Sequence, residues 1–454
     1  MHKYTSTNPY TEKTQFESDN ISNEELEVKI NNAQVAFLVQ SQSSLVNRKK
    51  LILELAEYFT ANKSDLALTI TNEMGKTLAE SMAEVEKCVL CCDYYAEHFE
   101  EFLQPKLYHS KFKKAFVSHE PLGVIYGIMP WNFPLWQVIR FAVPTLLAGN
   151  SILMKHAKSV PLSALALEDA FKTVSNVPHI YQNLFIDLQQ SDSIIAHKSV
   201  RGISVTGSTE AGKHIAEQAG KALKPMVLEL GGSDPVFILE SADIELIITE
   251  ITKSRNQNAG QSCISGKRFL VPNSMLEYFT AGYLQSISKY TLGNPLLEST
   301  TMGPLARKDL KETVIEQVKK AVKQGATFTE ANLELPAQGN FCKPGFLTNI
   351  NNDNFIRYEE VFGPVALIFG YDTVEEGIKL ANETDFGLGA SIWGNESEAE
   401  KLSSYIQSGC VYINTMVKST PEIPFGGTKS SGIGRELSDL GLYSFTNPKT
   451  VAIK

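Results

Sequence analysis

Cys263 has the surroundings of a reactive thiol. It lies in the segment Asn258-Ala-Gly-Gln-Ser-Cys-Ile-Ser-Gly266, where glycine and small polar residues let a substrate and a backbone N–H come close to the sulfur. A histidine partner would have to come from the first half of the chain, because all eight histidines lie at or before His214. A simpler partner is Glu229, which precedes a Gly-Gly pair by one residue, since a buried carboxylate with a raised pKa can activate water or the thiol.

The other five cysteines fit packing better than chemistry. Cys342 and Cys410 are interpreted as small apolar residues of the core. Cys88, Cys91 and Cys92 share one face of a predicted helix, where a metal would still need a fourth ligand, so core packing is favoured and no metal site is expected. Six cysteines in 454 residues do not form a disulfide framework, which indicates reduced thiols and a cytoplasmic protein.

The segment Gly207-Ser208-Thr-Glu-Ala-Gly212-Lys-His214 is a candidate for binding a phosphate. It nearly matches a P-loop, but His214 stands where a serine or threonine must ligate Mg²⁺. The usual dinucleotide fingerprint of three glycines after a strand is missing. Two interpretations stay open: a helix start whose N–H groups face a cofactor phosphate, which we favour, and a glycine-bounded helix start with no ligand.

Strands and helices must position these residues. From residue 123 onward, the hydrophobic pattern of the sequence predicts strands that alternate with helices. Apolar runs separated by helical periodicity predict a parallel, doubly wound sheet with strands at 123–128, 151–154, 183–186, 202–206 and 226–230. A second series is predicted at 236–239, 268–271, 364–369, 390–393 and 410–413. The first 104 residues have helical periodicity. Ligands sit beyond the carboxyl ends of such strands, which should bring together Asn132, Lys155, Gly207 and Glu229.

Composition narrows the possible functions. Hydrophobic residues make up 43% of the chain and charged residues 20%, which describes a folded globular protein. The net charge of −9 argues against binding the phosphate backbone of a nucleic acid over a broad face. The N-terminus is polar, and the longest uncharged stretch, Leu122–Ile139, contains Pro130 and Pro134. Neither a signal peptide nor a membrane-spanning helix is therefore expected.

Seven motifs, in order and spacing, resemble the aldehyde dehydrogenase superfamily over nearly the whole chain. They are Pro-Trp-Asn132-Phe-Pro, Lys155, Thr-Gly207-Ser-Thr-Glu-Ala-Gly212, Glu229-Leu-Gly-Gly, Gly260-Gln-Ser-Cys263, Glu360-Val-Phe362-Gly-Pro and Pro424-Phe-Gly-Gly-Thr-Lys-Ser-Ser-Gly. The Lys155-His-Ala run, the residues after Glu229 and the short N-terminus are most similar to compact bacterial NAD(P)-dependent succinate-semialdehyde dehydrogenases.

The resemblance implies an α/β fold with two doubly wound lobes and a small oligomerisation element. The expected cofactor-binding domain comprises residues 1–104 and 124–230, and the expected catalytic domain residues 231–421. Residues 105–123 and 422–454 are expected to form the oligomerisation element of a homodimer or homotetramer.

The resemblance also implies roles for individual residues. Cys263 would attack an aldehyde, Asn132 would hold the resulting oxyanion, and Glu229 would activate the water that hydrolyses the thioester. The presence of a glutamate at position 229 implies hydrolysis to a free acid, not transfer of the acyl group to coenzyme A. The expected cofactor-binding residues are Trp131, Lys155, Lys158, Gly207, Ser208, Gly212, Glu360 and Phe362.

Cofactor and substrate preference rest on fewer residues. Lys158 stands where NAD-preferring relatives often carry a glutamate, so use of NADP is expected, with NAD accepted too. Arg140 matches the arginine that binds a distal carboxylate, and Ser419 and Thr420 are expected to add hydroxyls. Gln257 occupies the position of a second arginine, so the carboxylate site departs there from the family pattern, and Gln257 is counted among the expected substrate-binding residues. A salt bridge at the helix surface or between domains is the alternative role for Arg140.

The sequence thus favours an NAD(P)-dependent dehydrogenase for a short ω-carboxy aldehyde, with succinate semialdehyde as the expected substrate. Two alternatives stay open: the same chemistry on neutral aliphatic or phosphorylated aldehydes, and a catalytically silent structural relative. The combination of Cys263, Glu229 and Asn132 argues against the silent relative.

Overall fold

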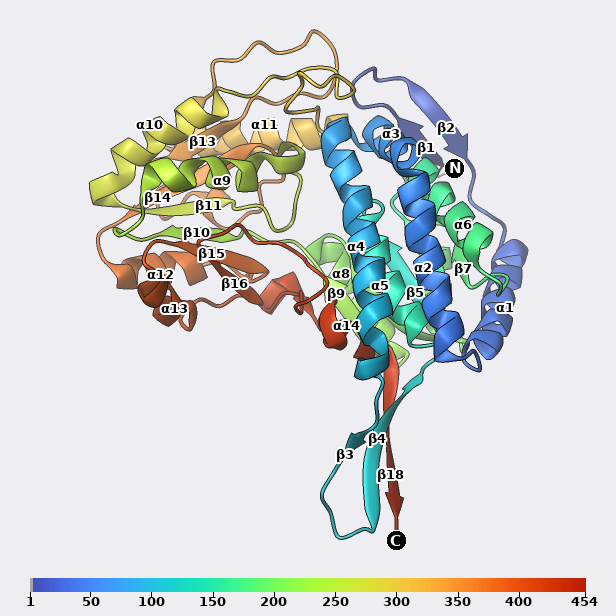
Figure 1. Cartoon of the computed structure of the whole chain (residues 1–454). Coiled ribbons are helices and arrows are strands. Elements are labelled where there is room, and N and C mark those ends of the chain that lie inside the picture. The colour runs from blue at the N-terminus through green and yellow to red at the C-terminus, as the bar shows by residue number, and fades with distance from the viewer. Residues whose placement is uncertain (1–2) are drawn as a thin grey trace.

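The computed structural model describes residues 3–454 and divides them into two lobes and a projecting arm (Figure 1). Each lobe is built on one largely parallel sheet with helices packed against it, and the arm carries the C-terminus. The predicted α/β fold with two doubly wound lobes is confirmed. Within residues 3–454, no helix combines the length and the apolar character that crossing a membrane requires.

The first sheet has the strand order β17-β9-β8-β5-β6-β7, and β17 alone runs antiparallel to its neighbour. The chain winds outward from β5 through β6 to β7 and then returns to β8 on the other side of β5. The carboxyl ends of β5 and β8 therefore border the crevice where the winding reverses and where such folds bind ligands. The strands are β5 (Val124–Met129), β6 (Ser151–His156), β7 (Tyr181–Asn183), β8 (Val200–Thr206), β9 (Met226–Glu229) and β17 (Gly432–Ile433).

Most helices of the first lobe share one large apolar core with this sheet, and the remaining ones pack in a second core that also includes residues of its strands. The side chains of Cys88, Cys91 and Cys92 are fully buried in the large core, on one face of α4, and burial raises the pKa of each thiol. The helices are α1 (Asn23–Gln40), α2 (Leu45–Ala61), α3 (Lys63–Met74), α4 (Leu78–Phe102), α5 (Trp136–Leu147), α6 (Pro161–Val174), α7 (Leu188–Ala196), α8 (Thr209–Lys221) and α14 (Ser438–Tyr443).

The second sheet has the order β12-β13-β14-β11-β10-β15-β16, with β12 antiparallel at one edge. Its strands are β10 (Pro235–Ile238), β11 (Arg268–Pro272), β12 (Thr327–Glu330), β13 (Gly345–Thr348), β14 (Val365–Tyr371), β15 (Gly389–Trp393) and β16 (Cys410–Ile413). Its helices are α9 (Ile244–Asn256), α10 (Leu276–Ile287), α11 (Lys308–Lys323), α12 (Val374–Asn382) and α13 (Glu396–Ser403).

The arm is a three-stranded antiparallel sheet that extends from the first lobe (Figure 1). Strand β4 (Lys114–Pro121) pairs along its whole length with β18 (Thr446–Ile453) and also with the short β3 (Lys106–Leu107). Of the segment 422–454, β18 is the part that joins the arm, because β17 pairs with β9 of the first sheet.

Three features differ from the expected elements. The third strand of the first lobe ends at Asn183, because the apolar residues 184–186 continue past the sheet and pack beneath Tyr4, whose hydroxyl donates to the carbonyl of Ile186. The N-terminal hairpin of β1 (Tyr4–Thr7) and β2 (Thr14–Ser18) was not predicted, since its strands are short and largely polar. Strands β12 and β13 were also not predicted, because each is only four residues long.

Glu84 of α4 forms a buried ion pair with Lys76 and also binds the start of α5. The Lys76 ammonium lies 2.5 Å from a Glu84 carboxylate oxygen, and both side chains are almost fully excluded from solvent. The other oxygen of Glu84 accepts the backbone N–H groups of Leu135 and Trp136, at 2.9 and 3.0 Å. Helix α5 has no side-chain cap of its own, so Glu84 supplies the acceptor that its first turn needs.

Replacing Glu84 by alanine should lower the melting temperature strongly. The change leaves the Lys76 cation buried without a partner, which typically costs about 3–5 kcal/mol of stability. Glu86→Ala is the matched control, because Glu86 lies on the same helix and pairs with Lys63 at the surface, where such a pair contributes about 1 kcal/mol or less. Differential scanning calorimetry measures both, and equal losses would contradict the role of Glu84.

Candidate active site

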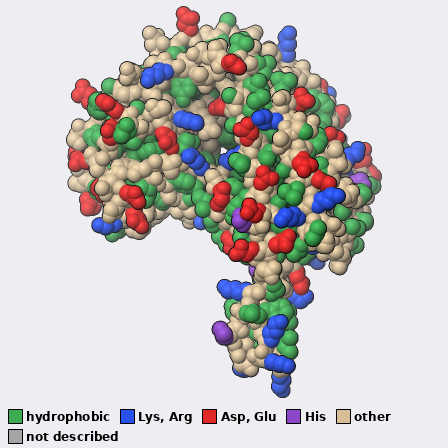
Figure 2. Space-filling view, viewed as in Figure 1, with side chains coloured by type: hydrophobic (Ala, Val, Ile, Leu, Met, Phe, Trp, Pro, Cys, Tyr) green, Lys and Arg blue, Asp and Glu red, His purple; other side chains and the backbone are tan. Residues whose placement is uncertain are grey.

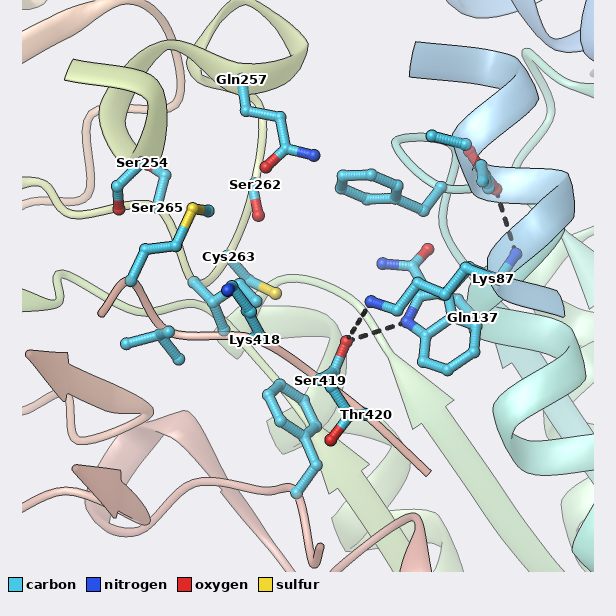
Figure 3. A pocket seen from close by; sticks show the side chains of 18 of the residues that line it. Lys87, Gln137, Ser254, Gln257, Ser262, Cys263, Ser265, Lys418, Ser419 and Thr420 are labelled. Atoms are coloured by element: carbon cyan, nitrogen blue, oxygen red, sulfur yellow. Dashed lines mark hydrogen bonds between the residues drawn. The ribbon is translucent and has the colours of Figure 1, made fainter. Parts of the chain in front are cut away.

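Cys263 opens into a cavity of about 300 Å³ between the two lobes. Its walls come from α4 and α5 of the first lobe, from the chain after α9, and from residues 416–420 (Figure 3). The face shown in Figure 2 is hollowed between the lobes, and Lys and Arg side chains are visible around the hollow. The basic residues that line the cavity are Lys87, Arg140, Lys253 and Lys418.

The backbone before Cys263 adopts an unusual conformation. Asn258 and Ala259 have positive φ angles of 57° and 52°, and Gly260 follows with 76°. A side chain at residue 260 would meet the carbonyl oxygen of Gly363 at 2.4 Å, so this position requires glycine. A non-glycine residue in the left-handed region costs on the order of 1 kcal/mol or more, and surrounding contacts must compensate.

Two fully buried cations supply those contacts. Arg255 donates to the Ser265 hydroxyl at 2.6 Å and to the carbonyls of Val361 and Val365, which fastens the loop to the chain before β14. Lys267 donates to the carbonyl oxygens of Ser262 and Cys263, at 2.9 and 2.7 Å. Sequence analysis gave neither residue a role, because only the fold shows which carbonyls they reach.

Asn132 follows β5 and is held against the same loop. Its amide N–H donates to the carbonyl of Gln261 at 3.0 Å, and its oxygen accepts from the Gln137 amide at 3.0 Å. The Asn258 side chain donates to the backbone carbonyl of Asn132. These bonds orient the NH₂ end of Asn132 toward the cysteine loop, so that its second N–H can serve an oxyanion near Cys263.

Glu229 ends β9 and is buried with no hydrogen-bond donor to its carboxylate from residues 3–454. Burial raises its pKa well above the ordinary value, and the neighbouring Glu436 raises it further. The Arg140 and Arg435 cations act in the opposite direction. A carboxyl group in this setting holds a proton more readily than one in water and is suited to general acid–base chemistry.

Arg140 lies at the centre of these buried charges. Its Nε is 2.5 Å from a Glu436 carboxylate oxygen, and a second nitrogen donates to the Thr206 hydroxyl at 3.1 Å. The prediction of Arg140 as the carboxylate-binding residue needs this qualification: the side chain lines the cavity, but its charge is already compensated by Glu436. Sequence analysis missed Glu436, which lies about 200 residues from Glu229 and carries no motif of its own.

Burial raises the pKa of the Cys263 thiol to about 11. The nearby cations of Arg140 and Lys267 lower it, and the carboxylates of Glu360 and Asp234 raise it. The balance favours the neutral thiol at neutral pH in the chain as described. Thiolate formation therefore requires a change in the surroundings of the sulfur, such as a bound ligand or a neighbouring proton acceptor.

The expected cofactor residues lie on both lobes. Lys155, near the end of β6, makes no ion pair or side-chain hydrogen bond with residues 3–454, and burial together with the neighbouring Lys158 lowers its pKa to about 8. Ser208 caps α8 by accepting the N–H of Ala211. Gly212 lets α8 approach β9, because a side chain there would meet Leu230 at 2.4 Å. Gly207 donates its N–H to the carbonyl of Glu229 at 3.0 Å.

Across the crevice, Glu360 accepts the N–H of Gly232 at 3.3 Å and pairs with Lys267 at 3.2 Å. Phe362 and Trp131 meet edge to face, with ring centroids 5.8 Å apart. Together with the free ammonium of Lys155, these residues offer a cation, a carboxylate and aromatic faces, which fits a nucleotide with phosphate and ribose hydroxyl groups.

The remaining expected substrate residues do converge. Gln257, Ser419 and Thr420 line the cavity that contains Cys263, as Figure 3 shows. Sequence analysis missed Lys87, which enters the same cavity from α4. Lys87 lies 176 residues before Cys263 in the chain, so only the packing of the two lobes brings the two residues to one cavity.

Comparisons with known proteins agree with this geometry. A profile of the aldehyde dehydrogenase family matches residues 2–451. A probable NADP⁺ succinate-semialdehyde dehydrogenase of Synechocystis sp. is 40% identical over 430 residues, covering 94% of this chain and 95% of its own. The NADP⁺ succinate-semialdehyde dehydrogenase of Deinococcus radiodurans is 37% identical, covering 99% and 94%. The crystal structure of succinic semialdehyde dehydrogenase from Streptococcus pyogenes with NADP⁺ has a TM-score of 0.97 at 34% identity, covering 99% of both chains.

Alkylation of Cys263 should accelerate steeply with pH. Because the thiol of the free protein has a pKa near 11, its thiolate fraction rises about tenfold per pH unit between about pH 7 and pH 9. Iodoacetamide labelling of the Cys263 peptide, followed by mass spectrometry, measures the rate. Cys263→Ser gives the background from other thiols. A rate that levels off near pH 8 would show that the free thiol is already activated.

Proposed function

Because the chain belongs to the aldehyde dehydrogenase family, we propose that it oxidises succinate semialdehyde to succinate with NADP⁺. The observation that carries this proposal is the position of Cys263 at a cavity between the lobes, with Asn132 hydrogen-bonded to the cysteine loop and with Glu229 close to Arg140, the same cation that acts on Cys263. The similarity to curated NADP⁺ succinate-semialdehyde dehydrogenases over nearly the full length supports the same substrate.

The chemistry follows from the groups at the cavity. The Cys263 thiolate adds to the aldehyde carbon, and the oxygen that becomes negative is held by the Asn132 amide and the Cys263 N–H. A nicotinamide cofactor held by Lys155, Glu360 and Phe362 would supply the hydride acceptor that this oxidation needs, and Cys263 would then carry the acyl group as a thioester. Glu229 takes a proton from a water molecule, and the resulting hydroxide attacks the thioester carbonyl and releases the acid with the thiol regenerated.

Arg140 contributes to this sequence through charge. It lowers the pKa of both Glu229 and Cys263, while Glu436 keeps Arg140 itself in place. A single buried cation thus favours the ionised forms of the nucleophile and the base. In this proposal Arg140 acts near the reacting atoms, and the distal end of the substrate is held by other groups.

Lys155 and Lys158 support the choice of NADP⁺. The two cations lie at and just beyond the end of β6, close enough that the charge of Lys158 lowers the pKa of Lys155. A phosphate on the adenosine ribose would relieve their mutual repulsion and form charge-assisted hydrogen bonds with either. A ribose without that phosphate offers no such compensation.

The arm supports self-association as part of the proposal. Strand β18 lies at the edge of its sheet, so one row of its backbone groups has no partner within residues 3–454. Leu107, Tyr108 and Phe112 are exposed on the same arm. Pairing through such edges would join two or four copies of the chain.

The proposal places the protein in the cytoplasm. Its cysteines are unpaired, which is consistent with a reducing environment.

Glu229→Gln should separate the two half-reactions. The variant can still transfer hydride but lacks a base for hydrolysis, so the thioester accumulates. Stopped-flow absorbance at the reduced-cofactor band should show a burst near one equivalent per active site, followed by turnover slowed about 100-fold or more. Cys263→Ala is the control and should show no burst. A normal steady-state rate in Glu229→Gln would refute the hydrolytic role.

Lys158→Glu should reverse the cofactor preference. Wild-type protein is expected to have the higher kcat/KM with NADP⁺, and the substituted carboxylate should lower that value about tenfold or more by repelling the extra phosphate. Lys172→Glu on α6, an exposed residue, makes the same charge change as a control. Steady-state kinetics with both cofactors measure the ratio. If the ratio of kcat/KM with NADP⁺ to kcat/KM with NAD⁺ is unchanged in Lys158→Glu, Lys158 is only a surface charge.

A further inference from the structure

Lys87 is a cation of the cavity that has no carboxylate partner. It projects from α4 and lines the cavity together with Cys263. No carboxylate of residues 3–454 forms an ion pair with it, and Glu84, the carboxylate that acts on its pKa, is itself paired with Lys76. Its ammonium lies over the Trp136 ring, 4.1 Å from the centroid. Arg140, by contrast, already has Glu436.

A hydroxyl group fixes the position of this ammonium. Lys87 Nζ donates to Ser419 Oγ at 2.9 Å, and Trp136 Nε1 donates to the same oxygen at 3.0 Å. With two donors aimed at its oxygen, the Ser419 hydroxyl has its own hydrogen left to donate, and it meets no acceptor among residues 3–454. Lys87 likewise retains N–H groups beyond the one given to Ser419.

Figure 3 shows how these groups lie relative to the reactive thiol. Lys87 and Ser419 stand on one side of the cavity and the sulfur of Cys263 faces them from the other. An aldehyde carbon at Cys263 therefore directs the rest of a short substrate toward an ammonium and a hydroxyl, both with hydrogens to donate. This donor set is the complement of a carboxylate.

We propose that Lys87 binds the distal carboxylate of the substrate and, with Ser419, determines the preference for ω-carboxy aldehydes over neutral ones. This inference rests on the proposed function, and it assigns to Lys87 the contact that the sequence motif assigned to Arg140. Arg140 keeps its place beside Glu436 and the reacting groups.

The charge state of Lys87 agrees with this role. Burial and the nearby Arg140 cation lower its pKa to about 8, against the opposing effects of Cys88, Glu84 and Cys91. The group remains mostly protonated at neutral pH. A cation that is partly stripped of water and not paired gains more from a bound carboxylate than a solvated or paired one does.

The test compares two aldehydes of the same chain length, succinate semialdehyde and butyraldehyde, with NADP⁺ at saturation. Lys87→Gln should raise KM for succinate semialdehyde at least about tenfold, while KM for butyraldehyde changes less than about twofold. Lys87→Arg keeps the charge and should retain most of the discrimination. Inhibition by succinate should weaken in Lys87→Gln by a factor similar to the rise in KM.

Two controls keep the result specific. Lys172→Gln removes one charge from an exposed side chain on α6, outside the cavity, and is expected to change either KM by less than about twofold. An equal rise in Lys172→Gln and Lys87→Gln would show that overall potential, not Lys87, selects the substrate. An unchanged melting temperature and far-UV circular dichroism spectrum of Lys87→Gln show that the variant is folded.

The outcomes also separate this inference from the proposed function. Equal kcat/KM values of the wild-type protein for the two aldehydes would refute succinate semialdehyde as the preferred substrate. If both the wild-type protein and Lys87→Gln prefer succinate semialdehyde to butyraldehyde, the proposed function holds but Lys87 does not bind the carboxylate. A selective rise in KM for succinate semialdehyde in Arg140→Leu together with an unchanged Lys87→Gln would return the carboxylate contact to Arg140.

Discussion

Burial of charge at the junction of the two lobes is the constraint on which the site depends. Removing Cys263 and Glu229 from water raises the pKa of both and favours their uncharged forms. One buried guanidinium, that of Arg140, opposes this effect for both groups, and Glu436 compensates its charge. The reactivity of the pair therefore depends on a balance of desolvation and nearby charge.

The same constraint explains why so many buried polar groups surround the cysteine loop. Left-handed residues 258–260 turn the chain sharply, and a loop of this kind leaves carbonyl groups without helix or sheet partners. Arg255 and Lys267 satisfy those carbonyls from fully buried positions. Rigidity of the loop thus comes from cations that bind backbone, while the catalytic side chains keep free atoms for the substrate.

Cations at the cavity have different tasks according to their partners. Lys267 and Arg140 pair with carboxylates and hold the site together, whereas Lys87 and Lys155 have none within residues 3–454 and are available to anionic groups that arrive from outside. A chain with a net charge of −9 can therefore still bind an anionic aldehyde and a phosphorylated cofactor. Local geometry, and not overall charge, controls these contacts.

Local sequence was sufficient to predict the two α/β lobes, the positions of Asn132 and Glu229 at the carboxyl ends of strands, and the small, polar surroundings of Cys263. These features depend on apolar periodicity, glycine spacing and side-chain chemistry, which all act over a few residues. Tertiary structure alone decided what Arg140 pairs with, that Lys87 shares a cavity with Cys263, and that β17 belongs to the first sheet. These facts depend on contacts between segments hundreds of residues apart. Such contacts form only when the lobes pack, and they cannot be predicted from the local sequence pattern.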